Sequence, residues 1–109
     1  ALPIYAPAVL KTYLSMSEAL GQSSLPASLR ERLALAISEK NNCAYCLAAH
    51  TVIGKMNGLT EAETIEARNG TASDPRDAAA LTFALRVRAI FHRTHRSPER
   101  NALPPRVGR

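Results

Sequence analysis

The apolar residues of this chain recur at the three- and four-residue spacing of an α-helix, and nowhere do β-branched or aromatic residues alternate long enough to build a strand. The sequence holds 3 Tyr, 2 Phe and no Trp, so its core has to be built mainly from Ala, Leu, Ile and Val. Ala and Leu favour helix, and small side chains suit close helix packing. We therefore predict an all-α fold, a compact helical domain of about five helices.

Proline, N-cap residues, and Gly or Asn divide the chain into five helical patterns. The predicted helices run from Pro7 to Gly21, from Pro26 to about Lys40, from Cys43 to Gly58, from Thr60 to about Asn69 and from Pro75 to about Ile90. Asn42 precedes the third pattern, and we expect it to cap that helix because Asn is favoured as an N-cap. Thr60 and Glu63 match a capping box, which predicts the start of the fourth helix.

Charge is distributed unevenly along the chain, whose formal net charge is +5. Residues 1–85 carry seven basic and eight acidic side chains, whereas residues 86–109 carry seven Arg and one acid, Glu99. We interpret residues 1–90 as one helical domain and residues 91–109 as a basic, Pro-containing tail that is disordered. An arginine-rich end can contact nucleic-acid phosphates. Without interleaved aromatic residues or a helix-turn-helix context, we favour a solvated tail and expect no nucleic-acid partner.

The first residues, Ala-Leu-Pro-Ile-Tyr-Ala-Pro, lack the basic region and the long apolar region of a signal peptide. No run of about 18 apolar residues offers a membrane span. We expect a cytoplasmic protein with no membrane partner.

The only two cysteines, Cys43 and Cys46, form a C-A-Y-C motif. This spacing brings both sulfurs to one face of a helical turn, close enough to form a disulfide, so the pair can cycle between dithiol and disulfide. If Asn42 caps the helix, Cys43 lies in its first turn, where the helix dipole stabilises a thiolate. His50 lies one turn after Cys46 and can take or return its proton. The pattern predicts thiol redox chemistry.

Two other interpretations of the cysteine pair stay open, namely buried structural thiols and a zinc site. Zinc usually takes four ligands, and Cys43, Cys46 and His50 supply three, crowded on one helix. Glu31 reaches the cysteines only if the second predicted helix folds back against the third, and taken alone it is a solvated charge. Glu39 is interpreted as a surface residue. We predict no metal and no cofactor.

The stretch from Leu29 to Thr51, with Glu31, C-x-x-C and C-x-x-x-H in order, resembles the carboxymuconolactone decarboxylase family and, within it, the alkylhydroperoxidase D branch. A Gly-Leu-Thr-Glu-Ala-Glu turn and an Asp-Pro-Arg-Asp-Ala-Ala-Ala-Leu helix extend the resemblance over about residues 25–90. One departure is Tyr45, because the better-known peroxidases carry a histidine between the cysteines. Another is the arginine-rich end, where the family usually keeps a helical, mixed-charge pattern.

The resemblance implies an alkylhydroperoxidase D-like fold and a thiol-dependent peroxidase. It implies that Cys46 attacks a hydroperoxide, that Cys43 then forms a disulfide with it, and that Glu31 and His50 form a proton relay. It also implies a dithiol reductant, such as a lipoyl group on a partner protein, and assembly of copies into a trimer or hexamer. Homo-oligomerisation is expected on physical grounds too, because the first and last predicted helices carry apolar groups on more than one side.

Two alternative functions stay open. Some relatives are decarboxylases or isomerases that act on small lactone acids, although these relatives usually lack the cysteine pair. A non-catalytic module that binds zinc or nucleic acid is the alternative from another class.

Overall fold

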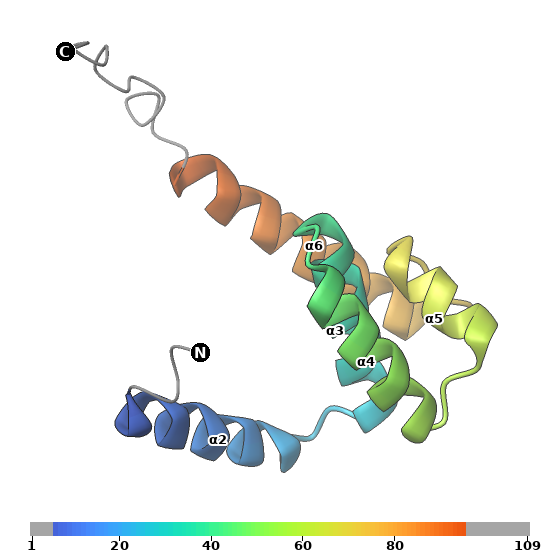
Figure 1. The fold of residues 1–109 in the computed structure, drawn as a ribbon. Helices are drawn as coiled ribbons and strands as arrows, with labels where there is room; N and C mark the ends of the chain where they lie inside the picture. The colour runs from blue at the N-terminus through green and yellow to red at the C-terminus, as the bar shows by residue number, and fades with distance from the viewer. Residues whose placement is uncertain (1–5, 96–109) are drawn as a thin grey trace, which may run out of the picture.

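A computed structural model describes residues 6–95 of the chain. Figure 1 labels its helices in order: α2 (Pro7–Gly21), α3 (Ala27–Lys40), α4 (Ala44–Met56), α5 (Glu61–Arg68) and α6 (Pro75–His95). No strand occurs among the described residues. The predicted all-α fold of about five helices is confirmed. None of the helices in this range is long and apolar enough to cross a membrane.

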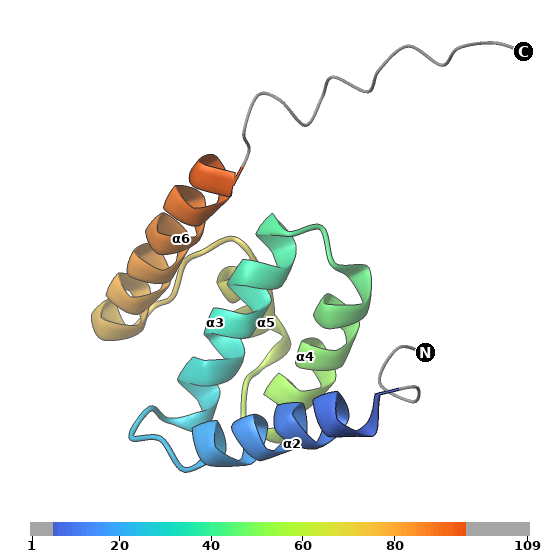
Figure 2. The same cartoon turned by 90° about the vertical axis from the view of Figure 1, so that its left-hand side faces the viewer.

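Helix α3 is the centre of the fold, because α4, α5 and α6 all pack against it. Figure 2 shows α4 and α6 on opposite sides of α3. The core joins Leu35 of α3 to Leu59 and Ala67, with Leu47 of α4 packed against this cluster. Leu81 of α6 is fully buried as well. Burial of these apolar side chains draws the four helices together and so fixes α4 relative to α3.

Helices α3 and α4 are each followed by a residue in the left-handed backbone conformation, Asn42 (φ 52°) and Gly58 (φ 94°). At the end of α3, the N–H of Cys43 donates to the Ser38 carbonyl and the N–H of Asn42 donates to the Glu39 carbonyl. This pair of hydrogen bonds is a Schellman C-cap. The prediction that Asn42 caps the next helix is therefore wrong. Asn tolerates the left-handed conformation better than most residues, and here it ends α3.

The capping box predicted at the start of α5 is present, with Thr60 and Glu63 each accepting a hydrogen bond from the other's backbone N–H. Glu63 also pairs with Arg32 of α3 at 2.6 Å, and Arg32 Nε lies 3.3 Å from Asp77 of α6. The pKa of Glu63 is lowered by the hydrogen bond from the Thr60 backbone, by the hydrogen bond with the Thr60 side chain and by the charge of Arg32. The buried Arg32 thus ties the first turns of α5 and α6 to α3.

Helix α6 extends to His95, five residues beyond its predicted end at Ile90. Residues 91–95 are therefore helical, where the sequence predicted the start of a disordered tail. No Gly or Pro occurs between Pro75 and Pro98, so nothing in the sequence breaks the helix earlier. The other residues of the predicted tail, 96–109, lie outside the described residues.

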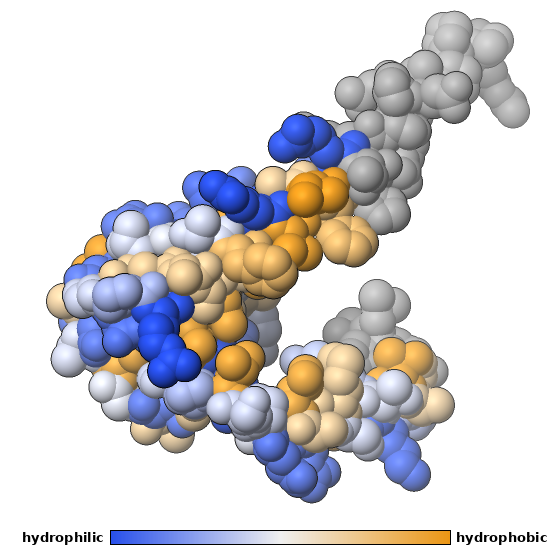
Figure 3. All heavy atoms as spheres, turned by 180° about the vertical axis from the view of Figure 1, so that it is seen from behind, coloured by the Kyte–Doolittle hydropathy of each residue, from blue (hydrophilic) through white to orange (hydrophobic). Residues whose placement is uncertain are grey.

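Helix α2 stands apart from the other four helices (Figure 1). None of its residues is buried. Figure 3 shows it as a separate lobe with apolar atoms on its surface. Among residues 6–95, no other helix covers the apolar side chains of α2.

Candidate active site

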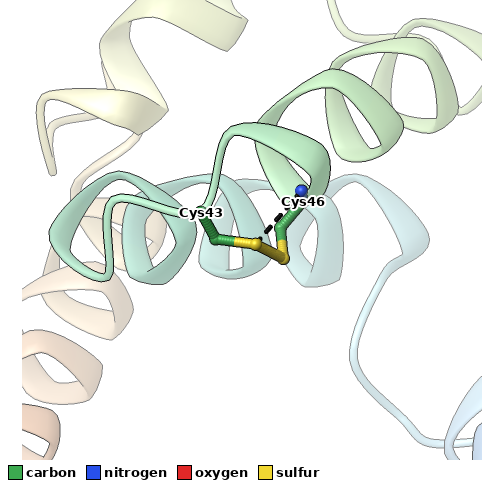
Figure 4. Close-up of a disulfide and its surroundings, with 2 residues drawn as sticks. All are labelled: Cys43 and Cys46. Atoms are coloured by element: carbon green, nitrogen blue, oxygen red, sulfur yellow. Dashed lines mark hydrogen bonds between the residues drawn. A yellow bond between two sulfur atoms is a disulfide. The ribbon is translucent and has the colours of Figure 1, made fainter. Parts of the chain in front are cut away.

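Cys43 and Cys46 are joined by a disulfide, and their Cα atoms are 5.3 Å apart (Figure 4). Cys43 is the N-cap residue of α4, and its Sγ accepts a hydrogen bond of 3.3 Å from the backbone N–H of Cys46. The prediction that this spacing allows a disulfide is confirmed. The capping residue is Cys43 itself rather than Asn42.

The cysteine pair therefore lies at the positive end of the α4 dipole. Negative charge at an exposed helix N-terminus is stabilised by about 0.3–1 kcal/mol. Cys43 holds the capping position and Cys46 lies in the first turn, and both side chains are partly buried. Once the disulfide is reduced, this environment favours the thiolate form, which is the reactive one.

His50 of α4 and Glu31 of α3 form a contact between the two helices. The Nδ1 atom of His50 lies 2.7 Å from Oε2 of Glu31, with side-chain exposures of 34% and 15%. A carboxylate can only accept a hydrogen bond, so Nδ1 is the donor and carries the proton. The Nε2 atom is then left free to accept a proton from another group.

Gly54 allows α3 and α4 to approach closely beside this contact. A Cβ atom at Gly54 would lie 3.1 Å from Cδ1 of Leu59 and 3.6 Å from Cβ of Glu31. Gly54 is buried and lies one turn after His50. The missing side chain at this position therefore helps Glu31 to reach His50.

Replacing Gly54 with Val is expected to lower the free energy of unfolding by about 1–3 kcal/mol, because the branched side chain overpacks its contacts with Leu59 and Glu31. Gly21→Val is the matched control, since a Cβ atom at Gly21 meets nothing within 4 Å. Urea unfolding of both variants measures the difference. Equal free energies of unfolding for the two variants would contradict the close packing assigned to Gly54.

The structure brings the four predicted site residues together only in part. Glu31 contacts His50, and no hydrogen bond among residues 6–95 joins His50 to either sulfur. His50 nevertheless lies one helical turn after Cys46 on α4, the separation at which side chains of a helix are neighbours. Hydrogen bonds of a catalytic base often form fully only when the substrate is bound. The chemical roles of these residues stay predictions.

A family model for the carboxymuconolactone decarboxylase family matches residues 7–89. The chain belongs to this family. A curated relative, "Uncharacterized protein YdfG" of Bacillus subtilis (strain 168), is 34% identical over 56 residues. That alignment covers 51% of this chain and 38% of YdfG, so the chain spans well under half the length of this relative. No solved structure matches the chain significantly.

This member of the carboxymuconolactone decarboxylase family has further features near the cysteines that sequence reasoning missed. Tyr45, between the cysteines, is 84% exposed, and Val52 and Met56 follow it on α4 as exposed apolar residues. Their spacing of seven and four residues places these three side chains on one face of the helix. This spacing is visible in the sequence, so the stripe could have been predicted from it. The capping role of Cys43 carried no comparable signal, because Asn42 beside it is a better N-cap by residue type.

The alternative of a zinc site gains no support from the geometry. Among residues 6–95, no three His, Cys, Asp or Glu side chains come together in an arrangement that could hold a metal ion.

Glu39, interpreted as a surface residue, pairs with Arg68 of α5 at 2.7 Å and is partly exposed. Glu39 is therefore a suitable control residue for Glu31, because both are glutamates of α3 that pair with a basic side chain.

Proposed function

We propose that this member of the carboxymuconolactone decarboxylase family is a thiol-dependent peroxidase that reduces hydroperoxides through Cys43 and Cys46. The observation that carries the proposal is the 2.7 Å contact between Glu31 of α3 and His50 of α4. The cysteine pair lies at the N-terminus of the same helix as His50. A dithiol at a helix N-terminus supplies a nucleophile. A carboxylate-oriented imidazole one turn away supplies a base.

In the first step, Nε2 of His50 takes the thiol proton of Cys46, and Glu31 stabilises the imidazolium that results. The Cys46 thiolate attacks the terminal, O–H oxygen of the hydroperoxide, so that an S–O bond forms and the O–O bond breaks. The departing alkoxide takes the proton from His50 and leaves as an alcohol. Cys46 is then a sulfenic acid.

In the second step, the Cys43 sulfur attacks the sulfenic sulfur of Cys46. An S–S bond forms, the S–O bond breaks, and hydroxide leaves with the Cys43 proton as water. The product is the disulfide of Figure 4. An external dithiol then supplies two electrons and two protons and becomes a disulfide itself. We propose a dithiol of the lipoyl type on a partner protein as this reductant.

A cycle of this kind needs a compartment that keeps supplying reduced thiols. Disulfides in the cytosol are usually transient and catalytic. The cytoplasm is accordingly the location proposed for this protein.

The proposal is tested by mixing the full chain with a hydroperoxide and dihydrolipoamide. We expect peroxide consumption with one dithiol oxidised per peroxide, and we expect Glu39→Gln to match the unchanged chain. Release of CO₂ from a small lactone acid, without any consumption of peroxide, would overturn the proposal in favour of the decarboxylase alternative.

A further inference from the structure

The last four backbone carbonyls of α3 have no partner within the helix, as at any helix C-terminus. Three of them accept hydrogen bonds from N–H groups of the turn that follows: Ile37 from Asn41, Ser38 from Cys43 and Glu39 from Asn42. The fourth carbonyl, that of Lys40, accepts a hydrogen bond of 2.8 Å from Nη2 of Arg88 on α6. A side chain 48 residues further along the chain thus completes the cap of α3.

Arg88 contacts the same turn a second time. Its Nε atom donates a hydrogen bond of 2.7 Å to Oδ1 of Asn41. Arg88 lies seven residues after the buried Leu81, which places both on one face of α6, a helix that packs against α3. Figure 2 shows the C-terminal ends of α3 and α6 at the same end of the molecule. The planar guanidinium reaches a backbone oxygen and a side-chain oxygen at once, and so it holds the turn at two points.

This turn carries one of the two cysteines. It consists of Asn41, Asn42 in the left-handed conformation and Cys43, and α4 begins at the next residue. Cys43 caps α4 and forms the disulfide with Cys46. Among residues 6–95, Arg88 forms no salt bridge, and its hydrogen bonds are those to the turn. The contact therefore holds the backbone directly before the sulfur of Cys43.

We propose that Arg88 is a positioning residue, which holds the α3–α4 turn in the conformation from which Cys43 closes the disulfide with Cys46. The inference rests on the dithiol cycle proposed above. Closing the disulfide orders the backbone around Cys43, and ordering a residue costs conformational entropy. A turn that Arg88 already orders loses less entropy, so the effective concentration of the two thiols is higher. Arg88 therefore favours the disulfide over the dithiol and speeds the attack of Cys43 on the sulfenic acid of Cys46.

The positive charge of Arg88 acts in the opposite direction, because a nearby cation stabilises thiolates and hence the reduced pair. Three variants separate position from charge. Arg88→Met keeps an unbranched apolar side chain and removes both the hydrogen bonds and the charge. Asn41→Ala removes one hydrogen bond and leaves the charge of Arg88 in place. Arg86→Met removes a charge two residues away on α6, from an exposed side chain that, among residues 6–95, has no hydrogen bond to the turn.

The equilibrium of each full chain with dihydrolipoamide measures the effect, with free thiols blocked and the oxidised fraction read by mass spectrometry. We expect Asn41→Ala and Arg88→Met to lower the equilibrium constant for the disulfide by about three- to tenfold, the size expected when a turn loses one or two hydrogen bonds. The double variant is expected to match Arg88→Met, because the Asn41 side chain acts through Arg88. Arg86→Met is expected to leave the constant unchanged or to raise it.

Unchanged constants in both Asn41→Ala and Arg88→Met would overturn the proposal, since the contact would then be merely structural. A fall in Arg86→Met equal to that in Arg88→Met would overturn it as well, because position on the helix would not matter. The equilibrium with dihydrolipoamide needs no peroxide, so it is independent of the peroxidase test. A chain that shows the expected falls but consumes no peroxide would refute the proposed function and retain the role of Arg88.

Discussion

Peroxide treatment of the reduced Cys43→Ser variant is expected to leave a stable sulfenic acid on Cys46, whereas the Cys46→Ser variant is expected to form none and to lose all turnover. The two sulfurs share the N-terminus of α4, but their positions differ. Cys43 is the cap, and Cys46 lies one turn before His50. Only Cys46 therefore has the base at the separation of helical neighbours. A sulfenate-specific reagent followed by mass spectrometry measures the modification at each residue.

The control for this experiment is the disulfide itself. The unchanged chain, treated with the same peroxide, is expected to lose both free thiols and to show no trapped sulfenic acid, because Cys43 closes the disulfide faster than the reagent reacts. Equal trapping in the two serine variants would contradict the assignment of Cys46 as the attacking residue. Such a result would still support thiol chemistry, but it would show that either cysteine can attack the peroxide.

His50→Gln is expected to slow peroxide turnover near neutral pH by about 10² or more, since the variant has no base to take the thiol proton. Glu31→Gln is expected to cause a smaller loss. Glutamine can still accept a hydrogen bond from Nδ1, but it carries no charge to stabilise the imidazolium. Turnover measured across a pH series separates the two effects. The His50→Gln loss should shrink at high pH, where thiolate forms without a base.

Glu39→Gln is the matched control for Glu31→Gln, because both glutamates lie on α3 and both have a basic partner. Removal of the Glu39 charge is expected to leave the pH profile of turnover unchanged. If His50→Gln lowers turnover equally at every pH, or if Glu39→Gln behaves like Glu31→Gln, the proton relay is wrong and the contact between α3 and α4 is structural.

The helices of this protein could be predicted from its sequence because local rules and packing agree in most of them. The capping box of Thr60 and Glu63 and the proline at the start of α6 act within a few residues, and a local pattern is enough to find them. Asn42 shows where such rules fail. Asn is favoured both before a helix and in the left-handed position after one, and only the hydrogen bonds of the folded chain decide between the two.

The candidate site was predictable to a smaller extent. The positions of Cys43, Cys46 and His50 relative to one another follow from a single helix. Glu31 lies nineteen residues before His50 and on another helix, so its contact with His50 depends on how α3 and α4 pack. That packing depends on Gly54 and Leu59, whose close approach no local pattern reports. A family resemblance pointed to Glu31, and periodicity alone did not.

The sulfur of Cys43 caps α4, and in the cycle that we propose it is also a redox atom. These two roles share one free-energy cycle, so they are linked by thermodynamic reciprocity. A ligand that binds the first turn of α4 more tightly when Cys43 is a thiolate than when it is in the disulfide must also shift the cysteine pair toward its reduced form. Conversely, the oxidation state must change how often that turn opens to solvent. Hydrogen exchange of the Cys46 amide proton, which is hydrogen-bonded to this sulfur, would therefore report the oxidation state of the pair in the proposed cycle.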